Sequence, residues 1–139
     1  MNLWIRLLMS LNVLVYRLSR GRLSSHMAGY PILLLHTTGR KTGLAYTIPL
    51  TYFRDGDNYL LVASNWGRKH NPGWYYNLMH QPAATIQVNE QVMAVQAHPA
   101  TGDEYTRLWK AVTSRNNFYV RYQKRTSRQI PIMILTPEG

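Results

Sequence analysis

The sequence contains no cysteine among its 139 residues. This absence excludes a disulfide framework, thiolate zinc sites, iron–sulfur clusters and a catalytic thiol. It is compatible with a reducing cytosol, and we expect a cytoplasmic protein. Acidic residues are scarce as well: 6 Asp and Glu stand against 16 Lys and Arg, and the formal net charge is +10. A chain this basic is expected to bind anions such as phosphates, polycarboxylates, nucleic acid or acidic lipids.

The chain also lacks an uninterrupted apolar stretch of about 20 residues, the length that spans a bilayer. Its first segment is apolar, but charged and polar residues from Arg6 to Arg17 interrupt it, and no small-x-small cleavage site follows. We therefore interpret residues 1–24 as a basic amphipathic helix. Two alternatives remain for it: the helix packs on the domain, or residues 1–22 lie on the anionic inner face of the cell membrane.

Clustered catalytic groups are missing too. The five histidines are scattered and show no H-x-x-x-H spacing, so we expect no metal site. No G-x-S-x-G elbow is present. Asp55 and Asp57 flank a turn, whereas Asp103 and Glu104 begin a helix, so no acid pair has the placement a hydrolase needs. With so few nucleophiles and acids, a reaction that depends mainly on a cofactor is the natural enzyme hypothesis.

The hydrophobic pattern after Gly29 predicts one domain over residues 25–139 made of short strands and helices. Asp55–Asn58 is typical of a hairpin turn, and Thr101-Gly-Asp-Glu104 of a capping box that starts a helix. Several antiparallel strands with few long connections favour an α+β fold, a small barrel of about six strands with three to four helices. We expect strands over 31–37, 46–53, 59–64, 84–88, 92–98 and 131–136, and helices over 72–80, from 101 onward and over 117–125.

A glycine-rich basic turn follows the first of these strands, Thr37-Thr-Gly-Arg-Lys-Thr-Gly43. Gly39 and Gly43 permit backbone conformations closed to other residues. A turn rich in exposed amides beside Arg40 and Lys41 can cradle a phosphate. Its spacing is not the Walker pattern, and many solvated hairpin turns share its composition, so the turn alone does not identify a site.

An aromatic segment over residues 63–78 combines a strand end, a loop and the start of a helix. Trp66 and Trp74 belong to it, and core packing is the common use of tryptophan. Ser64 and Asn77, however, have side chains that can hydrogen-bond the edge of a flat heterocycle. Together with the basic turn, this segment favours a planar, phosphorylated cofactor.

The order of the motifs is far more specific than any one of them. They are T-T-G-R-K-T-G, T-I-P-L, V-A-S-N-x-G, P-x-W-Y-x-N-L-x-x-x-P and Y-Q-x-R-T-x-R-Q-I-P. In this order the chain resembles the deazaflavin-dependent nitroreductase family over residues 30–137. The resemblance implies a split β-barrel related to the flavin reductase and pyridoxamine oxidase barrels. It also implies coenzyme F420, a phosphorylated deazaflavin with an oligoglutamate tail, and hydride transfer from its reduced form to quinones, nitroaromatics or enones.

The resemblance further implies which residues contact the cofactor and the acceptor. The family's cofactor-binding positions match Arg40, Lys41, Thr42, Gly43, Ile48, Pro49, Val62, Ala63, Ser64, Asn65, Trp74 and Asn77. Its acceptor-side positions, our candidate catalytic residues, match Tyr119, Tyr122 and Ser64. A tyrosine hydroxyl there could hydrogen-bond oxyanion charge that develops on the acceptor.

The chain departs from the family pattern at four positions. The family usually has Arg at Tyr46 and often Lys at Asn65, and it has acceptor-side tyrosines at Asn116 and Thr51. The first two departures remove positive charge from the phosphate region, where Arg68 and Lys69 are the cations available to replace it. The other two change the acceptor side, and with it the choice of acceptor.

Two alternative functions come from different classes. The same barrel could bind FMN, FAD or haem in place of the deazaflavin. The basic and aromatic segment from Arg115 to Arg125 is also typical of single-strand binders. Because the charge is divided between the two ends of the chain and no nucleic-acid motif is present, we expect a small-molecule electron acceptor and no nucleic acid. The sequence predicts no oligomeric state.

Overall fold

The computed structural model describes Val13, His26–Met27 and residues 30–138 of the chain. The predicted helix over residues 1–24 therefore lies, apart from Val13, outside the described residues. Val13 is helical and packs against Ile32 and Leu34. Within the part of the chain that is described, no helix is both long enough and apolar enough to cross a membrane.

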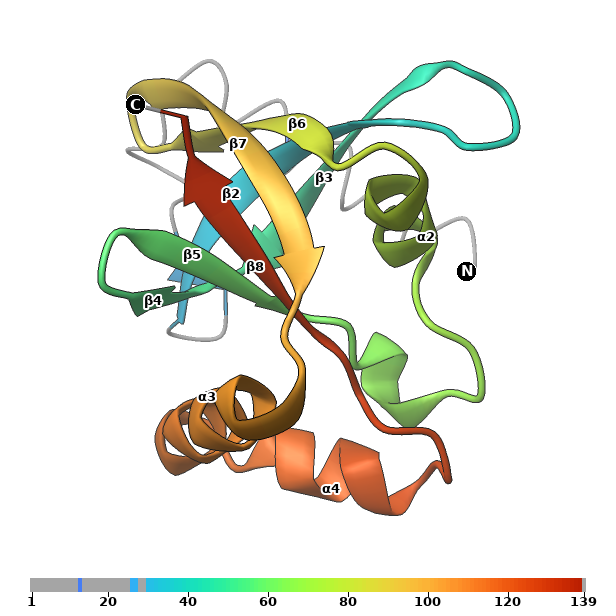
Figure 1. The fold of residues 1–139 in the computed structure, drawn as a ribbon, viewed down its shortest axis with the longest axis vertical. Coiled ribbons are helices and arrows are strands. Elements are labelled where there is room, and N and C mark those ends of the chain that lie inside the picture. Colours follow the sequence, from blue (N-terminus) through green and yellow to red (C-terminus); the bar gives the residue numbers. More distant parts are fainter. Residues whose placement is uncertain (1–12, 14–25, 28–29, 139) are drawn as a thin grey trace.

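The described chain forms one antiparallel sheet of eight strands (Figure 1). Its strand order is β1-β2-β6-β7-β8-β5-β4, and β3 pairs with β2. Neighbouring strands in this order are joined by backbone hydrogen bonds in antiparallel register. The strands are β1 (His26–Met27), β2 (Tyr30–Thr38), β3 (Ala45–Thr51), β4 (Phe53–Asp55), β5 (Asn58–Val62), β6 (Ala83–Val88), β7 (Gln91–Pro99) and β8 (Ile132–Pro137).

The sheet curls so that its two edges approach each other at Tyr52. β3 pairs only with β2 and β4 only with β5 among the described strands, yet Tyr52 alone separates β3 from β4 in the chain. The Tyr52 amide donates to the Pro31 carbonyl at 3.3 Å, and its ring meets that of Tyr59 edge-on at 5.4 Å between centroids. The barrel thus stays open between β3 and β4, which is the predicted split barrel.

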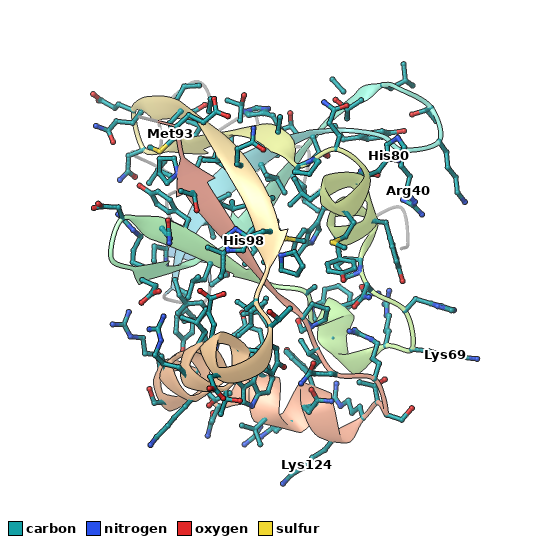
Figure 2. All side chains as sticks on the ribbon, in the orientation of Figure 1. Arg40, Lys69, His80, Met93, His98 and Lys124 are labelled. Atoms are coloured by element: carbon teal, nitrogen blue, oxygen red, sulfur yellow. The ribbon has the colours of Figure 1, made fainter. Side chains whose placement is uncertain are left out.

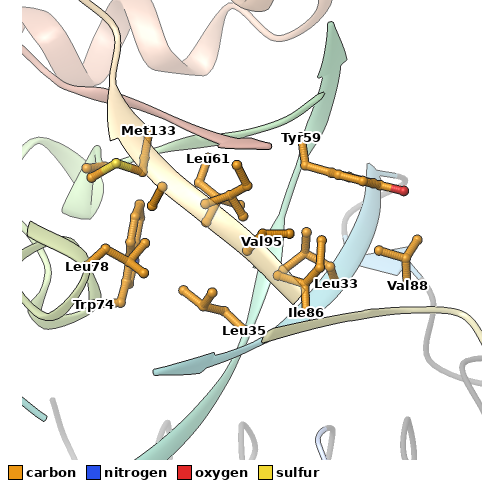
Figure 3. Close-up of a cluster of buried hydrophobic side chains, with 13 residues drawn as sticks. Leu33, Leu35, Tyr59, Leu61, Trp74, Leu78, Ile86, Val88, Val95 and Met133 are labelled. Atoms are coloured by element: carbon orange, nitrogen blue, oxygen red, sulfur yellow. The ribbon is translucent and has the colours of Figure 1, made fainter. Parts of the chain in front are cut away.

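The interior of the barrel is filled by alternate side chains of the strands (Figure 3). In β2, Leu33 and Leu35 point inward, whereas Ile32 and Leu34 lie on the outer face. This alternation is the period of two that a strand imposes on its side chains. The largest cluster of buried side chains contains Leu33, Leu35, Tyr59, Leu61, Ala63, Trp74, Leu78, Ile86, Val88, Val95, Ala97, Met133 and Leu135.

Three α-helices and one 3₁₀ turn complete the described chain. They are η1 (Asn65–Gly67), α2 (Gly73–His80), α3 (Gly102–Arg115) and α4 (Phe118–Lys124). α3 and α4 cover the outer face of β5 and β8, where Leu60, Ile132 and Ile134 pack against Leu108 and Tyr119. α2 lies at the other end of the barrel (Figure 1) and inserts Trp74 and Leu78 into the interior cluster.

Every predicted strand and helix within the described residues is confirmed, with two corrections to detail. The strand expected over 46–53 is divided at Tyr52, because the chain there leaves β2 and joins β5. The capping box is wrong: Thr101 is the N-cap of α3 but accepts no hydrogen bond through its side chain. Gly102 follows with a φ of 56°. This left-handed residue makes the first turn irregular, so the amides of that turn do not reach the threonine oxygen.

Candidate functional site

The basic turn between β2 and β3 is closed by its own backbone. The Gly43 amide donates to the Gly39 carbonyl at 2.8 Å, and the Gly39 amide donates to the Leu44 carbonyl at 2.8 Å. Gly43 has a φ of 71°, in the left-handed region that side chains disfavour. Arg40 and Lys41 are exposed at the tip of this turn. The turn thus presents two cations on a fixed backbone.

Tyr46, where the resemblance predicts an arginine, packs on the same turn. A Cβ atom at Gly39 would lie 2.5 Å from the Tyr46 ring, so only glycine fits beneath it. The Tyr46 hydroxyl lies 3.2 Å from the Thr42 hydroxyl, which also accepts from the Leu44 amide at 3.2 Å. Tyr46 therefore stabilises the shape of the turn but adds no charge to it.

Asn77 connects the basic turn to α2. Its Oδ1 accepts from the Arg40 amide at 3.1 Å and from Arg40 Nη1 at 3.3 Å, and its Nδ2 donates to the Thr37 hydroxyl at 3.4 Å. The Arg40 guanidinium lies 4.9 Å from the centroid of the Tyr76 ring, and Figure 2 shows Arg40 beside α2. Both polar groups of Asn77 thus bind protein, and the structure gives this predicted cofactor contact the role of orienting Arg40.

The strand end after β5 has an unusual backbone. Asn65, Trp66 and Gly67 have φ values of 46°, 58° and 76°, three successive residues in the left-handed region. Ser64 before them is right-handed. A right-handed residue followed by a left-handed one turns successive amides toward one side, which creates a concave anion site. The Ser64 hydroxyl has no hydrogen-bond partner among the described residues, so it is available to a ligand.

Several predicted cofactor residues are buried in the protein instead of exposed beside the turn. Ala63 is 0% exposed and Trp74 7%, and both belong to the interior cluster. Ile48 packs against that cluster, whereas Pro49 pairs with Leu34 and so lies on the outer face. Val62 packs on the outer cluster beneath α3 and α4. The side chains of these five residues form the walls of the barrel. Of the five, Ile48 is the one that faces the interior from β3, the strand at the open edge.

The acceptor-side candidate Tyr119 is buried on α4, with 9% of its surface exposed. Its ring meets those of Phe53 and Tyr122 edge-on, each at 6.0 Å between centroids. Burial raises the pKa of Tyr119 to about 12, and nearby Tyr122 and Tyr30 add to the rise. The hydroxyl therefore stays protonated at neutral pH. Among the described residues it has no hydrogen-bond partner, so its proton is free to be donated.

The other acceptor-side candidates differ in burial. Tyr122 is half-buried, with the Arg125 guanidinium 5.5 Å from its ring centroid. Asn116, where the resemblance predicts a tyrosine, is buried, and its Oδ1 accepts from the Phe118 amide at 3.0 Å. That bond stabilises the start of α4. Thr51 is half-buried on β3, at the open edge of the barrel.

The positive charges around this region lack acidic partners. No Asp or Glu occurs between Asp57 and Glu90, and within the described residues the salt bridges do not include Arg40, Lys41, Arg68 or Lys69. Figure 2 shows Lys69 pointing outward from the loop after η1. Exposed cations, converging amides and a free serine hydroxyl fit a ligand with phosphate and carboxylate groups. In the same described region, no group of three or more His, Asp or Glu residues could hold a metal ion.

One residue with many contacts in this region was missed by the sequence reasoning. Arg128 donates hydrogen bonds to the Ala63 and Ser64 carbonyls at 3.2 and 2.8 Å, although it lies far away in the sequence. The signal was present in the second arginine of the motif Y-Q-x-R-T-x-R-Q-I-P. Motif order alone could not indicate that the Arg128 side chain contacts the residues that follow β5.

Comparison with known proteins places these features in a family. The model of a family described as F420H(2)-dependent quinone reductase matches residues 8–137. The chain is 46% identical over 133 residues to an F420H(2)-dependent quinone reductase of Mycobacterium tuberculosis, covering 93% of this chain and 89% of that protein. Among solved structures, an F420-H2 dependent reductase superposes with a TM-score of 0.69 and 33% identity, over 76% of this chain and 93% of the other. A domain-swapped dimer superposes with a TM-score of 0.72 and 30% identity, over 95% and 96%.

Proposed function

Because the chain belongs to the F420H(2)-dependent quinone reductase family, we propose that it is an oxidoreductase that uses reduced coenzyme F420 to reduce a quinone. The observation that supports this most is the match of the family model over residues 8–137, nearly the whole chain. The identity of 46% to a named quinone reductase agrees with it. When bound, the reduced deazaflavin supplies the hydride, and the protein's own residues bind and orient the reactants.

The residues proposed to hold the cofactor are those with unpaired charge or free polar groups. Arg40 and Lys41 on the basic turn are assigned to the phosphate and the acidic tail, because both are exposed cations that form no salt bridge within the described part of the chain. The amides and hydroxyl at Ser64 and Asn65 are assigned to the polar edge of the cofactor. Asn77 contributes through its two hydrogen bonds to Arg40. In this assignment the basic turn and the strand end after β5 contact the same ligand from two sides.

Tyr119 is the residue proposed to act on the acceptor. Reduction of a quinone places negative charge on its oxygen, and a donor aimed at that oxygen stabilises the charge as it develops. The Tyr119 hydroxyl is protonated at neutral pH, as an ordinary tyrosine is, and burial raises its pKa further, to about 12. It has no hydrogen-bond partner among the described residues, so its O–H can donate to an acceptor oxygen. Tyr122 and Ser64 are the alternative donors. Nitroaromatics and enones also develop charge on oxygen, so the same donor would serve them.

An alternative function keeps the same barrel but replaces the deazaflavin with FMN or FAD. FMN and FAD also contain phosphate and a flat ring system, so the basic turn alone does not distinguish them. The family match favours the deazaflavin, because the matching model and relatives are named for F420H2.

Turnover with defined reactants tests the proposal. Reduced F420 and menadione are mixed with the purified protein without oxygen, and oxidation of the deazaflavin is followed by its fluorescence. We expect oxidation that needs both the protein and the quinone, and much slower oxidation of reduced FMN. Turnover with reduced FMN and none with reduced F420 would assign the barrel to flavin.

Peripheral membrane association through residues 1–22 is part of the proposal for localisation. The arginines near the end of that segment would suit anionic head groups. The contact of Val13 with Ile32 and Leu34 supports the alternative, in which the segment packs on the barrel.

Deletion of residues 1–22 separates these alternatives. If the segment binds lipid, the intact protein should pellet with vesicles that contain anionic lipid, and the deletion should abolish pelleting. If the segment packs on the barrel, the deletion should lower the melting temperature, because Ile32 and Leu34 become exposed. Unchanged melting without vesicle binding would contradict both.

A further inference from the structure

Arg128 uses four hydrogen bonds to hold one loop. Its Nε donates to the Arg68 carbonyl at 3.0 Å, its Nη1 to the Ala63 carbonyl at 3.2 Å and to Asn71 Oδ1 at 2.6 Å, and its Nη2 to the Ser64 carbonyl at 2.8 Å. These acceptors lie at the start, in the middle and at the end of the Ser64–Asn71 loop. A planar guanidinium has five N–H donors in a fixed arrangement, so a single side chain closes the loop.

The backbone of Arg128 is itself fastened to α4. Gln123 Nε2 donates to the Arg128 carbonyl at 2.6 Å, and Gln123 Oε1 accepts from the Ile130 amide at 3.0 Å. Arg125 adds a second link, because its Nη1 donates to the Trp66 carbonyl at 3.4 Å. The loop after β5 and the helix with the acceptor-side tyrosines are thereby connected through residues 123–130.

Direct packing brings the same two elements together at Gly67. A Cβ atom there would lie 2.6 Å from the Tyr122 carbonyl oxygen, so the backbones of η1 and α4 approach as closely as glycine allows. The three left-handed residues Asn65, Trp66 and Gly67 occupy this contact. A non-glycine residue keeps a left-handed conformation only where the surrounding structure imposes it. The hydrogen bonds from Arg128 are such an external constraint.

The charge of Arg128 has no acidic partner among the described residues. Its four acceptors are three carbonyls and one amide oxygen, all neutral. Burial lowers the pKa of the guanidinium, while nearby Tyr76 and Tyr75 act in the opposite direction. Because the four acceptors are neutral, they fix the loop without cancelling the positive charge of Arg128. That remaining charge would favour an anionic ligand at Ser64.

We propose that Arg128 is a positioning residue for the cofactor site, which holds the Ser64–Asn71 loop at a fixed place relative to α4. The proposal rests on the proposed function, because it assigns Ser64 and Asn65 to the cofactor and Tyr119 to the acceptor. Arg128 itself touches neither reactant in this account. It fixes the distance between the group that binds the cofactor and the helix that binds the acceptor.

The shape of the side chain, and not only its charge, is essential to this role. A lysine has three donors on one atom and cannot reach four acceptors spread around a planar fork. Arg128→Lys should therefore fail nearly as badly as Arg128→Gln. If the charge alone mattered, the lysine variant would keep most of the wild-type affinity.

The test compares these two variants with a matched control. Arg54 also donates three hydrogen bonds, to the Asn58 and Gly56 carbonyls and to the Tyr59 hydroxyl, but it lies in the β4–β5 hairpin. Binding of reduced F420 is measured by fluorescence titration, and turnover and melting temperature are measured in parallel. We expect both Arg128 variants to bind at least about 10-fold more weakly. Their kcat with menadione should fall by about 10- to 100-fold, because the reactants are misplaced. Arg54→Lys should lower only the melting temperature.

The outcomes separate this proposal from the proposed function. If the wild-type protein does not bind reduced F420, the proposed function fails. If the wild type binds and the Arg128 variants match it in affinity and kcat while melting earlier, Arg128 is a purely structural residue and the proposal is overturned. Should both Arg128 variants fail to fold, Asn71→Ala removes one acceptor and keeps the arginine. It should then weaken cofactor binding by about 3- to 10-fold, and unchanged binding would overturn the proposal.

Discussion

The positive charges on two sides of the barrel have different partners. In the β4–β5 hairpin and the neighbouring α3, Arg54 and Arg107 stabilise the fold. Arg107 forms two hydrogen bonds of 3.0 Å with the Asp55 carboxylate, and Arg54 donates to two carbonyls of the hairpin and to Tyr59. On the side formed by the basic turn, η1 and α2, Arg40 and Lys41 have no acidic partner among the described residues.

The backbone differs between the two sides in the same way. The hairpin needs one left-handed residue, Gly56, and a side chain there would meet no atom within 4 Å. The strand end has three left-handed residues in succession, and two of them, Asn65 and Trp66, are not glycine. Unpaired charge and an imposed backbone occur together on one side only. This coincidence supports the proposed ligand site, because proteins depart from simple folding rules mainly at functional sites.

The largest expected effect is the loss of cofactor binding when the free cations are removed. Arg40→Ala with Lys41→Ala should weaken binding of reduced F420 by about 1.5–3 kcal/mol for each charged hydrogen bond lost. High salt should reduce this difference, since it screens the wild-type contacts. Fluorescence titration at two salt concentrations measures the effect, and Arg54→Ala is the control that should bind normally. Equal affinities of the double variant and the wild type would show that Arg40 and Lys41 are only solvated.

The second prediction compares two left-handed glycines. Gly67→Ala should destabilise the protein by about 2–5 kcal/mol, because it combines the cost of a left-handed side chain with a clash against the Tyr122 carbonyl. Gly56→Ala has only the first cost and should destabilise by about 1–2 kcal/mol. Urea unfolding measures both free energies. Equal stability of the two variants would contradict the close contact between Gly67 and the Tyr122 carbonyl.

The third prediction compares two buried tyrosines whose pKa values are both raised to about 12 by burial. The Tyr105 hydroxyl donates to the Ile130 carbonyl at 2.6 Å, whereas that of Tyr119 has no partner among the described residues. Tyr105→Phe should therefore cost about 1–3 kcal/mol of stability and leave turnover unchanged. Tyr119→Phe should leave stability unchanged and lower menadione reduction by about 10- to 1000-fold. Wild-type turnover by the Tyr119 variant would make that residue a core aromatic only.

The smallest effect concerns the ion pair of the hairpin side. The hydrogen bond with Arg107 lowers the pKa of Asp55, so the pair stabilises the fold above the ordinary aspartate pKa. This stabilisation is lost as the pH falls through the lowered pKa of the folded state. Asp55→Asn should lower the melting temperature by about 1–3 °C at pH 7, because the pair is exposed. The wild type and the Asp55→Asn variant should have the same melting temperature at pH values well below the lowered pKa. A difference in melting temperature that persists there would show that the ion pair is not its cause.

Much of the fold could be predicted from the sequence, because hydrophobic period and turn residues act locally. The strand over 31–37, the hairpin at Asp55–Asn58 and the helix that begins near residue 101 were each predicted from local pattern alone. The division of one predicted strand at Tyr52 could not be predicted, since it depends on how the curled sheet closes. The capping box failed for a similar reason, because the left-handed Gly102 becomes visible only in three dimensions.

The candidate site was predictable only as far as motifs extend. The order of motifs indicated the basic turn and the strand end, and the resemblance assigned their residues to a cofactor. It did not distinguish side chains that face a ligand from those that build the walls, such as Ala63 and Trp74. Nor did it show the role of Arg128, since hydrogen bonds to acceptors 57 to 65 residues away leave no local pattern.

We propose that the unpaired cations of the site bind a phosphorylated deazaflavin. The most direct test is titration of the wild-type protein with reduced F420 and with FMN over a series of salt concentrations. We expect micromolar-class affinity for reduced F420, weaker affinity for FMN, and an affinity for the deazaflavin that falls steadily as salt increases. Tight FMN binding without deazaflavin binding, or deazaflavin binding that salt does not change, would contradict it.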